Sequence, residues 1–300
     1  MTRTLLVFLA VPAVCNAWDP AGHMLVGQIA WRHMTPVARE RAAELVALID
    51  GKFNGGKPYN FVTVGCWMDD LRELPKKEYP WSKWHYIDGE KSADGSGFKI
   101  PEPPHVVWAI EQNIATLKDA AATKEKRAEA LGQLIHWVGD VHQPLHATTW
   151  NNDRGGNGYM IYGVPFSDLM SGQSSNLHTY WDKAFRFDSA DGKIVEAWKA
   201  PAARPEAPGE GIIAERANEI DTAISPGIVA EIKNATGAEA WARESHTIGC
   251  TKAYPPGEHP ADIEVRKLEA AWVKDSRKVA EQRIVIAGHR LANLLNELLK

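Results

Sequence analysis

The chain has 300 residues, of which 44% are hydrophobic and 24% are charged, and its formal net charge is −4. This composition supplies enough apolar side chains for a sizeable core and excludes a largely disordered chain. The acidic balance excludes the basic surface by which duplex-binding proteins hold DNA, but it allows a nucleic-acid substrate held by bound cations.

Residues 1–17 have the layout of a secretory signal peptide. Arg3 precedes an apolar run from Leu5 to Val14, and the small residue Ala17 ends the segment. The apolar run is too short to span a bilayer, and no later segment is long enough to do so. We expect cleavage after Ala17 and export to the periplasm or the medium, with Trp18 as the mature N-terminus.

The three cysteines bear on both export and pairing. A lipoprotein anchor at Cys15 is the alternative to cleavage after Ala17, and Val14 disfavours it because such signals need a very small residue there. Cleavage removes Cys15 and leaves Cys66 and Cys250, an even pair in an exported chain. We expect a disulfide between these two residues.

Helical periodicity dominates the remainder, so we predict one mostly helical, all-α domain over residues 18–300. Thr35 followed by Pro36 is a favourable N-cap and first-turn pair for a helix that runs to about Asp50. Further helical stretches cover residues 21–34, 60–73, 105–122, 125–143, 177–186, 212–224, 237–248 and 261–299, the last as two helices. Only residues 158–166 resemble strands, as a small hairpin.

Two histidine–aspartate pairs are spaced for chelation. Residues four apart share one helix face, so an imidazole nitrogen and a carboxylate at this spacing point the same way. The pairs are His136 with Asp140 in HWVGDVHQPLH, and His178 with Asp182 in NLHTYWD. Pro144 ends the first of these helices, which lets His146 reach a place that the helix face cannot.

Three other segments, WDPAGH, CWMDDLRE and KWHYID, add nitrogen and oxygen donors. In the first, the α-amino group freed by cleavage is itself a strong nitrogen ligand. Nitrogen and carboxylate ligands without thiolates suit zinc held for catalysis, because such sites keep open positions. In chain order the donors are Trp18 and His23, Asp69 and Asp70, and His85 and Asp88.

Six motifs in this order, WDPAGH, WMDDLR, WHYID, HWVGDVHQPLH, DRGGN and NLHTYWD, resemble those of the trinuclear-zinc, single-strand-preferring nucleases of fungi, plants and bacteria. The match is dense from Trp18 to Asp182 and continues more thinly through WARESH and AGHRLANLLN. That family shares its helical fold with zinc-dependent phospholipase C, so the resemblance implies the same all-α fold here.

The resemblance implies three zinc ions, each with its own ligands. One ion would be held by Asp69, His85, His136 and Asp140. A second, bridged to the first through Asp140 and a water, would use the amine and carbonyl of Trp18 together with His23. The third would lie on His146, His178 and Asp182.

The resemblance also implies roles around the metals. Asp69, Arg72 and Asp140 would be the catalytic residues, with Arg72 at the family's phosphate-facing arginine. Tyr86 and Asp88 fall where the family stacks on and hydrogen-bonds the nucleobase, although Tyr86 could instead be core packing. Fungal members carry an aromatic residue shortly before NLH, where this chain has Gln173 and Ser174. A second stacking platform is therefore not expected there.

Several neighbouring polar residues have simpler interpretations. His142 lies off the face of the chelating pair and is expected to be structural, and Asp70 could exchange roles with Asp69. Asp153 in the DRGGN motif is expected to organise its loop. The remaining histidines, which are His33, His105, His246, His259 and His289, are interpreted as ordinary.

Residues and resemblance together predict an exported zinc-dependent phosphodiesterase. It would hydrolyse single-stranded DNA and RNA to 5′-phosphorylated products and act as a 3′-nucleotidase. A zinc-dependent phospholipase C and a zinc-stabilised binding protein without turnover are the alternatives. The nucleobase-facing positions favour the nuclease. We expect no stable membrane insertion and no obligate protein partner.

Overall fold

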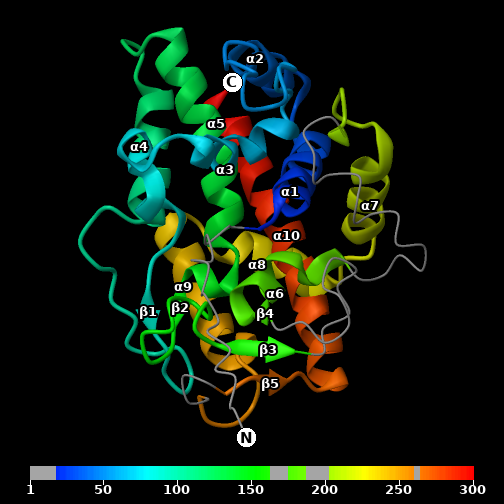
Figure 1. Cartoon of the computed structure of the whole chain (residues 1–300). Helices are drawn as coiled ribbons and strands as arrows, with labels where there is room; N and C mark the ends of the chain where they lie inside the picture. The colour runs from blue at the N-terminus through cyan, green and yellow to red at the C-terminus, as the bar shows by residue number, and fades with distance from the viewer. Residues whose placement is uncertain (1–17, 163–174, 187–202, 260–263) are drawn as a thin grey trace, which may run out of the picture.

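The computed structural model describes residues 18–162, 175–186, 203–259 and 264–300, and within them the fold is all-α, as predicted (Figure 1). Its α-helices are α1 (Pro20–His33), α2 (Pro36–Val46), α3 (Trp67–Asp70), α4 (Val106–Lys118), α5 (Lys124–Val141), α6 (Leu177–Lys183), α7 (Gly211–Thr222), α8 (Pro226–Asn234), α9 (Ala238–Ile248) and α10 (Ala270–Leu298). Across the described ranges, no helix has the length and apolar character needed to cross a membrane.

Short turns of 3-10 helix connect these elements, and several of them carry candidate ligands. They are η1 (Thr63–Cys66), η2 (Leu71–Glu73), η3 (Lys76–Glu78), η4 (Pro80–His85), η5 (Pro144–His146) and η6 (Ala184–Arg186), and a π-helical turn, η8 (Gly249–Ala253), follows α9. The segment expected as one helix over residues 60–73 is thus η1, α3 and η2 in succession.

The described strands are short and form two small sheets. β1 (Gly89–Glu90) pairs in parallel with β2 (Thr148–Thr149), with Gly89 opposite Thr148. β3 (Met160–Tyr162) lies between β4 (Ser175–Asn176), which is antiparallel to it, and β5 (Arg266–Lys267), which is parallel. The strand expected near residues 158–166 is β3, and residues 163–166 lie outside the described part of the chain.

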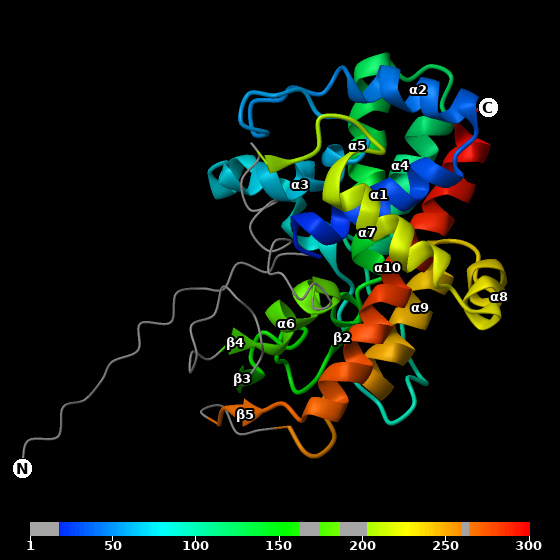
Figure 2. The same cartoon turned by 90° about the vertical axis from the view of Figure 1, so that its right-hand side faces the viewer.

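Helix α1 is enclosed by α5, α7 and α10 (Figures 1 and 2). Asp19 caps it by accepting hydrogen bonds from the amides of Ala21 (3.0 Å) and Gly22 (3.1 Å), and Pro20 suits its first turn. Every residue from Ala21 to Ala30 is buried. The first turns of α1, including His23, therefore lie inside the protein instead of at its surface.

Helix α5 enters from the surface and ends in the core. Thr123 caps it, and every residue from Ala130 to Val141 is buried. The helix ends at Val141, and Pro144 begins η5, as the proline position predicts. The last two turns of α5 and the short turn η5 therefore supply side chains to one interior space.

Two expectations about the helices are wrong. Residues 261–299 do not contain two helices, because the described part forms the single helix α10, in which Gly288 packs against α1 without breaking the helix. Helix α8 was not expected. Ser225 and Pro226 start it with the same N-cap and first-turn pair that Thr35 and Pro36 provide for α2.

The structure also contradicts the predicted disulfide, because Cys66 and Cys250 are free thiols. The sulfur of Cys66 lies 3.4 Å from the carbonyl oxygen of Pro20, whereas that of Cys250 lies 3.4 Å from Nε2 of His246. Burial raises the pKa of Cys66 to about 12 and also raises that of Cys250. The cysteine count favoured a pair, but pairing requires two side chains that meet.

Replacing Gly288 with alanine should destabilise the protein. A Cβ there would lie 2.6 Å from both Cβ and Cγ2 of Ile29 on α1, and overpacking of this kind costs about 1–3 kcal/mol. Gly227→Ala on α8 is the matched control, since its nearest neighbour is Oγ of Ser225 at 3.7 Å. Urea denaturation would compare the free energies of unfolding. Equal effects at both positions would contradict the close packing of α10 on α1.

Candidate metal centre

Eight buried or nearly buried histidine and aspartate side chains gather where α1, α3, α5 and α6 meet η4 and η5. They form three groups in which one donor atom of each member lies within 4.8 Å of the others. The eight are the histidines and aspartates that the family resemblance placed in the metal sites. The groups are His23, Asp69 and His136; His85, His136 and Asp140; and His146, His178 and Asp182.

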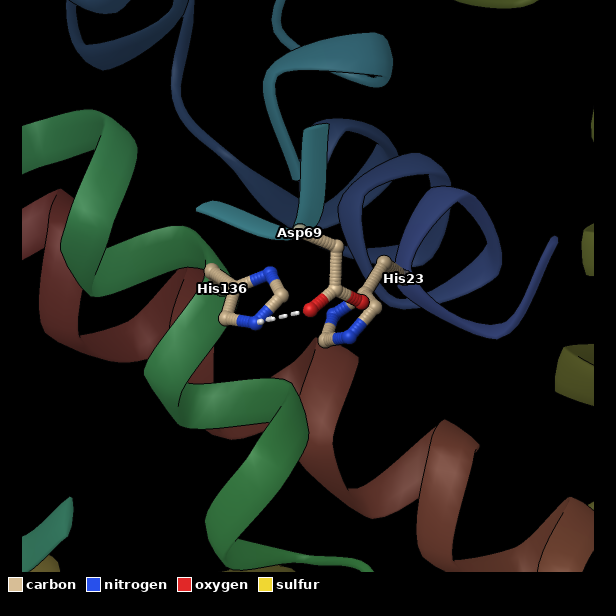
Figure 3. A group of neighbouring side chains, drawn as sticks. All are labelled: His23, Asp69 and His136. Carbon is tan, nitrogen blue, oxygen red and sulfur yellow. Dashed lines mark ion pairs between the residues drawn. The ribbon is translucent and has the colours of Figure 1, made fainter. Parts of the chain in front are cut away.

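The first group draws one residue from each of three helices (Figure 3). Nε2 of His136 on α5 lies 3.9 Å from Oδ1 of Asp69 on α3, and the ring of His23 on α1 stacks on that of His136 at 3.9 Å. A separation of 3.9 Å is too long for a hydrogen bond. It is still short enough for both atoms to lie about 2 Å from one ion.

Asp140 connects the first two groups. Its Oδ2 lies 2.9 Å from Nδ1 of His85 and 3.2 Å from Nε2 of His136. Its Oδ1 lies 3.5 Å from Nε2 of His23 and 3.8 Å from Nδ1 of His146. The carboxylate is fully buried. Because its two oxygens face different imidazoles, it has the geometry of a carboxylate that bridges two ions.

Backbone carbonyls determine which nitrogen three of the imidazoles present. Each of these rings places Nδ1 2.7 Å from a carbonyl oxygen, so Nδ1 carries the proton and Nε2 turns towards the cluster with a free lone pair. Metal-binding histidines are commonly oriented in this way. The pairs are His136 with Gly65, His146 with His85, and His178 with Gly155.

His85 is oriented by Tyr79, which the sequence did not single out. The Tyr79 hydroxyl donates to the carbonyl of Met68 at 3.0 Å and lies 2.5 Å from Nε2 of His85. Because the phenol O–H donates to the Met68 carbonyl, the phenol oxygen accepts a hydrogen bond from Nε2–H of His85. Nδ1 of His85 then carries the lone pair of the ring, which faces Asp140. Burial raises the pKa of Tyr79, so the phenol stays protonated. No spacing rule connects Tyr79 to a metal ligand, so only the structure reveals it.

Several donor atoms of the cluster lack a hydrogen-bond partner within the described ranges. They are both ring nitrogens of His23, Oδ1 of Asp140 and Nε2 of His146. An unpartnered buried polar atom costs about 1–3 kcal/mol. Divalent cations would give a partner to Oδ1 of Asp140, to Nε2 of His146 and to the one nitrogen of His23 that carries a lone pair. The donor set, with imidazole and carboxylate and no thiolate, fits zinc.

Burial tunes the titration of the cluster. It lowers the pKa of His23, His85 and His146 well below the ordinary value, with neighbouring cations adding to the effect. Burial also lowers the pKa of His136, but the carboxylates of Asp140 and Asp69 more than offset it and leave that pKa raised. Three imidazoles are therefore held in the neutral form that binds metals.

The pKa values of Asp140 and Asp182 shift in the opposite direction. Burial raises the pKa of Asp140 to about 7, and it raises that of Asp182 well above its usual range. Uncompensated negative charge is thus unfavourable in this space. Bound cations would remove the cost and keep both carboxylates ionised.

The third group lies beside Trp18. The rings of His146 and His178 stack at 5.0 Å, and Nε2 of His178 lies 3.7 Å from Oδ2 of Asp182. Trp18 is fully buried, and its indole N–H donates to the carbonyl of Gly139 at 2.9 Å. The amide of Asp19 donates to the carbonyl of Asp182 at 3.1 Å. The chain at Trp18 is therefore held between α5 and α6, next to the ligands.

A cavity of about 130 Å³ opens beside the cluster. The expected substrate-facing residues Arg72, Tyr86 and Asp88 line it together with the candidate ligands His85, His146 and His178. Nε of Arg72 lies 3.0 Å from Oδ1 of Asp69. Burial, aided by the nearby carboxylate of Asp153, raises the pKa of Asp88 to about 6.

Arg154, in the DRGGN motif, also lines the cavity, and no role is expected for it from the sequence.

The residues with simpler interpretations lie off the cluster. Asp70 turns away from Asp69 and makes two hydrogen bonds with Arg204, at 2.6 and 2.7 Å. His142 donates from Nδ1 to the carbonyl of Val138 at 2.7 Å, and its Nε2 lies 2.9 Å from Arg290. Asp69 is therefore the carboxylate of this pair that reaches the cluster, and His142 has the contacts of a structural histidine.

Asp153 organises its loop as expected. Its Oδ1 accepts hydrogen bonds from the amides of Trp150 (3.1 Å) and Gly156 (2.9 Å) and from the hydroxyl of Tyr254 (3.0 Å). Gly155 in this loop has φ 63°, a conformation that glycine adopts without strain, and its carbonyl orients His178. Gln173 and Ser174, where a stacking ring is missing, lie outside the described residues.

Comparison with known proteins agrees with this geometry. The family model described as S1/P1 Nuclease matches residues 18–300. Nuclease P1 of Penicillium citrinum is 24% identical over 289 residues, covering 94% of this chain and 97% of its own length. Nuclease S1 of Aspergillus oryzae is 24% identical over 96% of this chain and 94% of its own length, and Endonuclease 2 of Arabidopsis thaliana is 24% identical over 99% and 96%. The chain is therefore a nuclease-type hydrolase that belongs to the S1/P1 nuclease family.

Proposed function

We propose that the chain is an exported zinc-dependent phosphodiesterase that cleaves single-stranded DNA and RNA to 5′-phosphorylated products and also acts as a 3′-nucleotidase. Residues 1–17 would be the signal peptide and residues 18–300 the nuclease domain. The observation that carries the proposal is the buried set of eight histidines and aspartates beside a cavity. The relatives named as nucleases and endonucleases support the same substrate class.

The resemblance divides the donor set among three ions. Asp140 would bridge the first two ions, and the third ion would have its own ligands. Trp18 would contribute its α-amine and carbonyl to the ion that His23 binds. Bound zinc would supply an activated water and neutralise negative charge on the phosphodiester. The proposed ligands are Asp69, His85, His136 and Asp140; Trp18, His23 and Asp140; and His146, His178 and Asp182.

Arg72 would hold the phosphate. Its guanidinium lines the cavity, and Oδ1 of Asp69 positions it at 3.0 Å. Burial lowers the pKa of Arg72, but the charge of Asp69 and a hydrogen bond with Tyr79 more than offset this and leave the pKa raised. The side chain is therefore a fixed cation that would donate to the non-bridging oxygens as charge develops on them.

Tyr86 and Asp88 would hold the nucleobase. Both line the same cavity as Arg72, so a phosphate on the arginine would place its base near the phenol ring and the carboxylate. A base can reach them only if it leaves the duplex stack, which explains a preference for single strands. With a pKa raised to about 6, Asp88 is mostly ionised near pH 7 and can accept from a base N–H.

Substrate assays test the proposal directly. Protein that begins at Trp18 should hydrolyse single-stranded DNA faster than the matched duplex, and EDTA should abolish hydrolysis and lower Tm, because the ions bind only the folded state. Asp140→Asn should lose the activity and reduce the effect of EDTA on Tm, since the third ion has its own ligands. Hydrolysis of lecithin alone would replace the nuclease with a phospholipase C. An EDTA-sensitive Tm without any hydrolysis would favour a binding protein.

Replacing Arg72 with alanine should lower kcat/KM on single-stranded DNA by about 10²–10³-fold, the usual cost of one charge-stabilising donor. Arg72→Lys should recover part of the loss, and bound zinc should be unchanged in both variants. Arg41→Ala, at an exposed position on α2, controls for the removal of a positive charge. An unchanged kcat/KM in Arg72→Ala would remove the arginine from the site.

Adding one residue before Trp18 should cost one equivalent of bound zinc and most of the activity. The α-amine then becomes an amide nitrogen, which cannot ligate, while the indole contact with Gly139 can persist. Elemental analysis and single-strand cleavage would be compared with those of protein processed after Ala17. Normal turnover of the extended form would overturn the assignment of the second ion.

A further inference from the structure

A second histidine–aspartate cluster lies at the other end of α1, away from the metal centre. His33 ends α1, Asp221 comes from α7 and His289 from α10. Their donor atoms lie within 4.8 Å of one another. Figure 2 shows α1, α7 and α10 side by side, and this cluster, the α1–α7–α10 triad, joins all three. None of the three residues lines the substrate cavity, and only His289 lies in a segment of the family resemblance, AGHRLANLLN.

The two imidazoles converge on one carboxylate. Nε2 of His33 lies 2.9 Å from Oδ2 of Asp221, and Nε2 of His289 lies 2.8 Å from Oδ1. The rings are 4.0 Å apart at an interplanar angle of 33°, so their Nε2 edges face the same way. This arrangement offers two imidazole nitrogens and a carboxylate to one point between the helices.

Exposure leaves this point open to solvent. The side chain of Asp221 is 4% exposed, whereas those of His289 and His33 are 17% and 38% exposed. A buried carboxylate with two partly exposed imidazoles would leave water to complete the coordination of an ion.

The charges near the triad permit a cation. Nε of Arg32 lies 3.6 Å from Oδ2 of Asp221, but its terminal nitrogen is held by Oδ1 of Asn218 at 2.7 Å. Burial raises the pKa of Asp221, but the hydrogen bonds from His289 and His33 outweigh it and leave that pKa lowered. The carboxylate is therefore ionised at neutral pH, and an ion would displace the two ring protons.

We propose that His33, Asp221 and His289 form a fourth metal site, for a divalent transition-metal ion such as Zn²⁺. Two imidazoles and a carboxylate are typical ligands of such ions, whereas Mg²⁺ and Ca²⁺ prefer all-oxygen sites. The ion would tie α1, α7 and α10 together at the end of α1 opposite His23. It is a structural site, and catalysis at the three-ion centre does not require it.

Zinc content tests the proposal. The mature protein, His33→Gln and His289→Gln would each be dialysed against the same buffered zinc and analysed for bound metal. Glutamine can still donate an amide hydrogen bond to Asp221 but is a poor zinc ligand. Each variant should bind one equivalent less than the wild type while cleaving single-stranded DNA at the same rate. Glu215→Gln, at an exposed position on α7, should match the wild type.

Thermal stability gives a second readout. Added zinc should raise the Tm of wild-type protein whose three-ion centre is already loaded, and it should not raise the Tm of His289→Gln. Equal zinc contents in the wild type and both variants would overturn the proposal and leave the triad as a hydrogen-bonded cluster. The two proposals fail separately. The difference in zinc content between the wild type and each variant tests the triad, whereas the zinc content that remains in the variants tests the three-ion centre.

Discussion

The structure depends on a set of buried nitrogen and oxygen donors that the protein alone does not satisfy. Asp140 is fully buried, and its Oδ1 accepts no hydrogen bond within the described ranges. Both ring nitrogens of His23 are likewise buried and have no hydrogen-bond partner there. Such atoms destabilise a core unless cations complete them. Under the proposed function, metal binding would therefore contribute to the folding free energy of this protein as well as to its chemistry.

The fold brings these donors together through a few local devices. Asp19 starts α1 inside the core, and Pro144 ends α5 so that His146 lies on a separate turn. The amide of Ile87 donates to the carbonyl of His146 at 2.7 Å, which ties the segment after η4 to η5. Residues far apart in sequence thus reach one space because each helix end is fixed by its cap or by its neighbour.

Much of the site could be predicted from sequence because its ligands follow short-range rules. The spacing of His136 and Asp140, one helical turn apart, indicates a shared helix face, and the structure places both side chains in one donor group with His85. Contacts between distant segments carry no such signal. The Tyr79–His85 contact, the separation of the two cysteines and the convergence of His33, Asp221 and His289 depend on how the helices pack. Helix α8 is different, since Ser225 and Pro226 are a start signal that the sequence itself contains.

The most direct test of this account is anomalous diffraction at the zinc edge from crystals of the protein processed to Trp18. We predict three strong peaks in the space enclosed by α1, α3, α5 and α6, two of them flanking Asp140 and the third beside His178 and Asp182. Fully active protein with no anomalous density among these side chains would contradict the claim that buried donors in this family member exist to hold divalent ions.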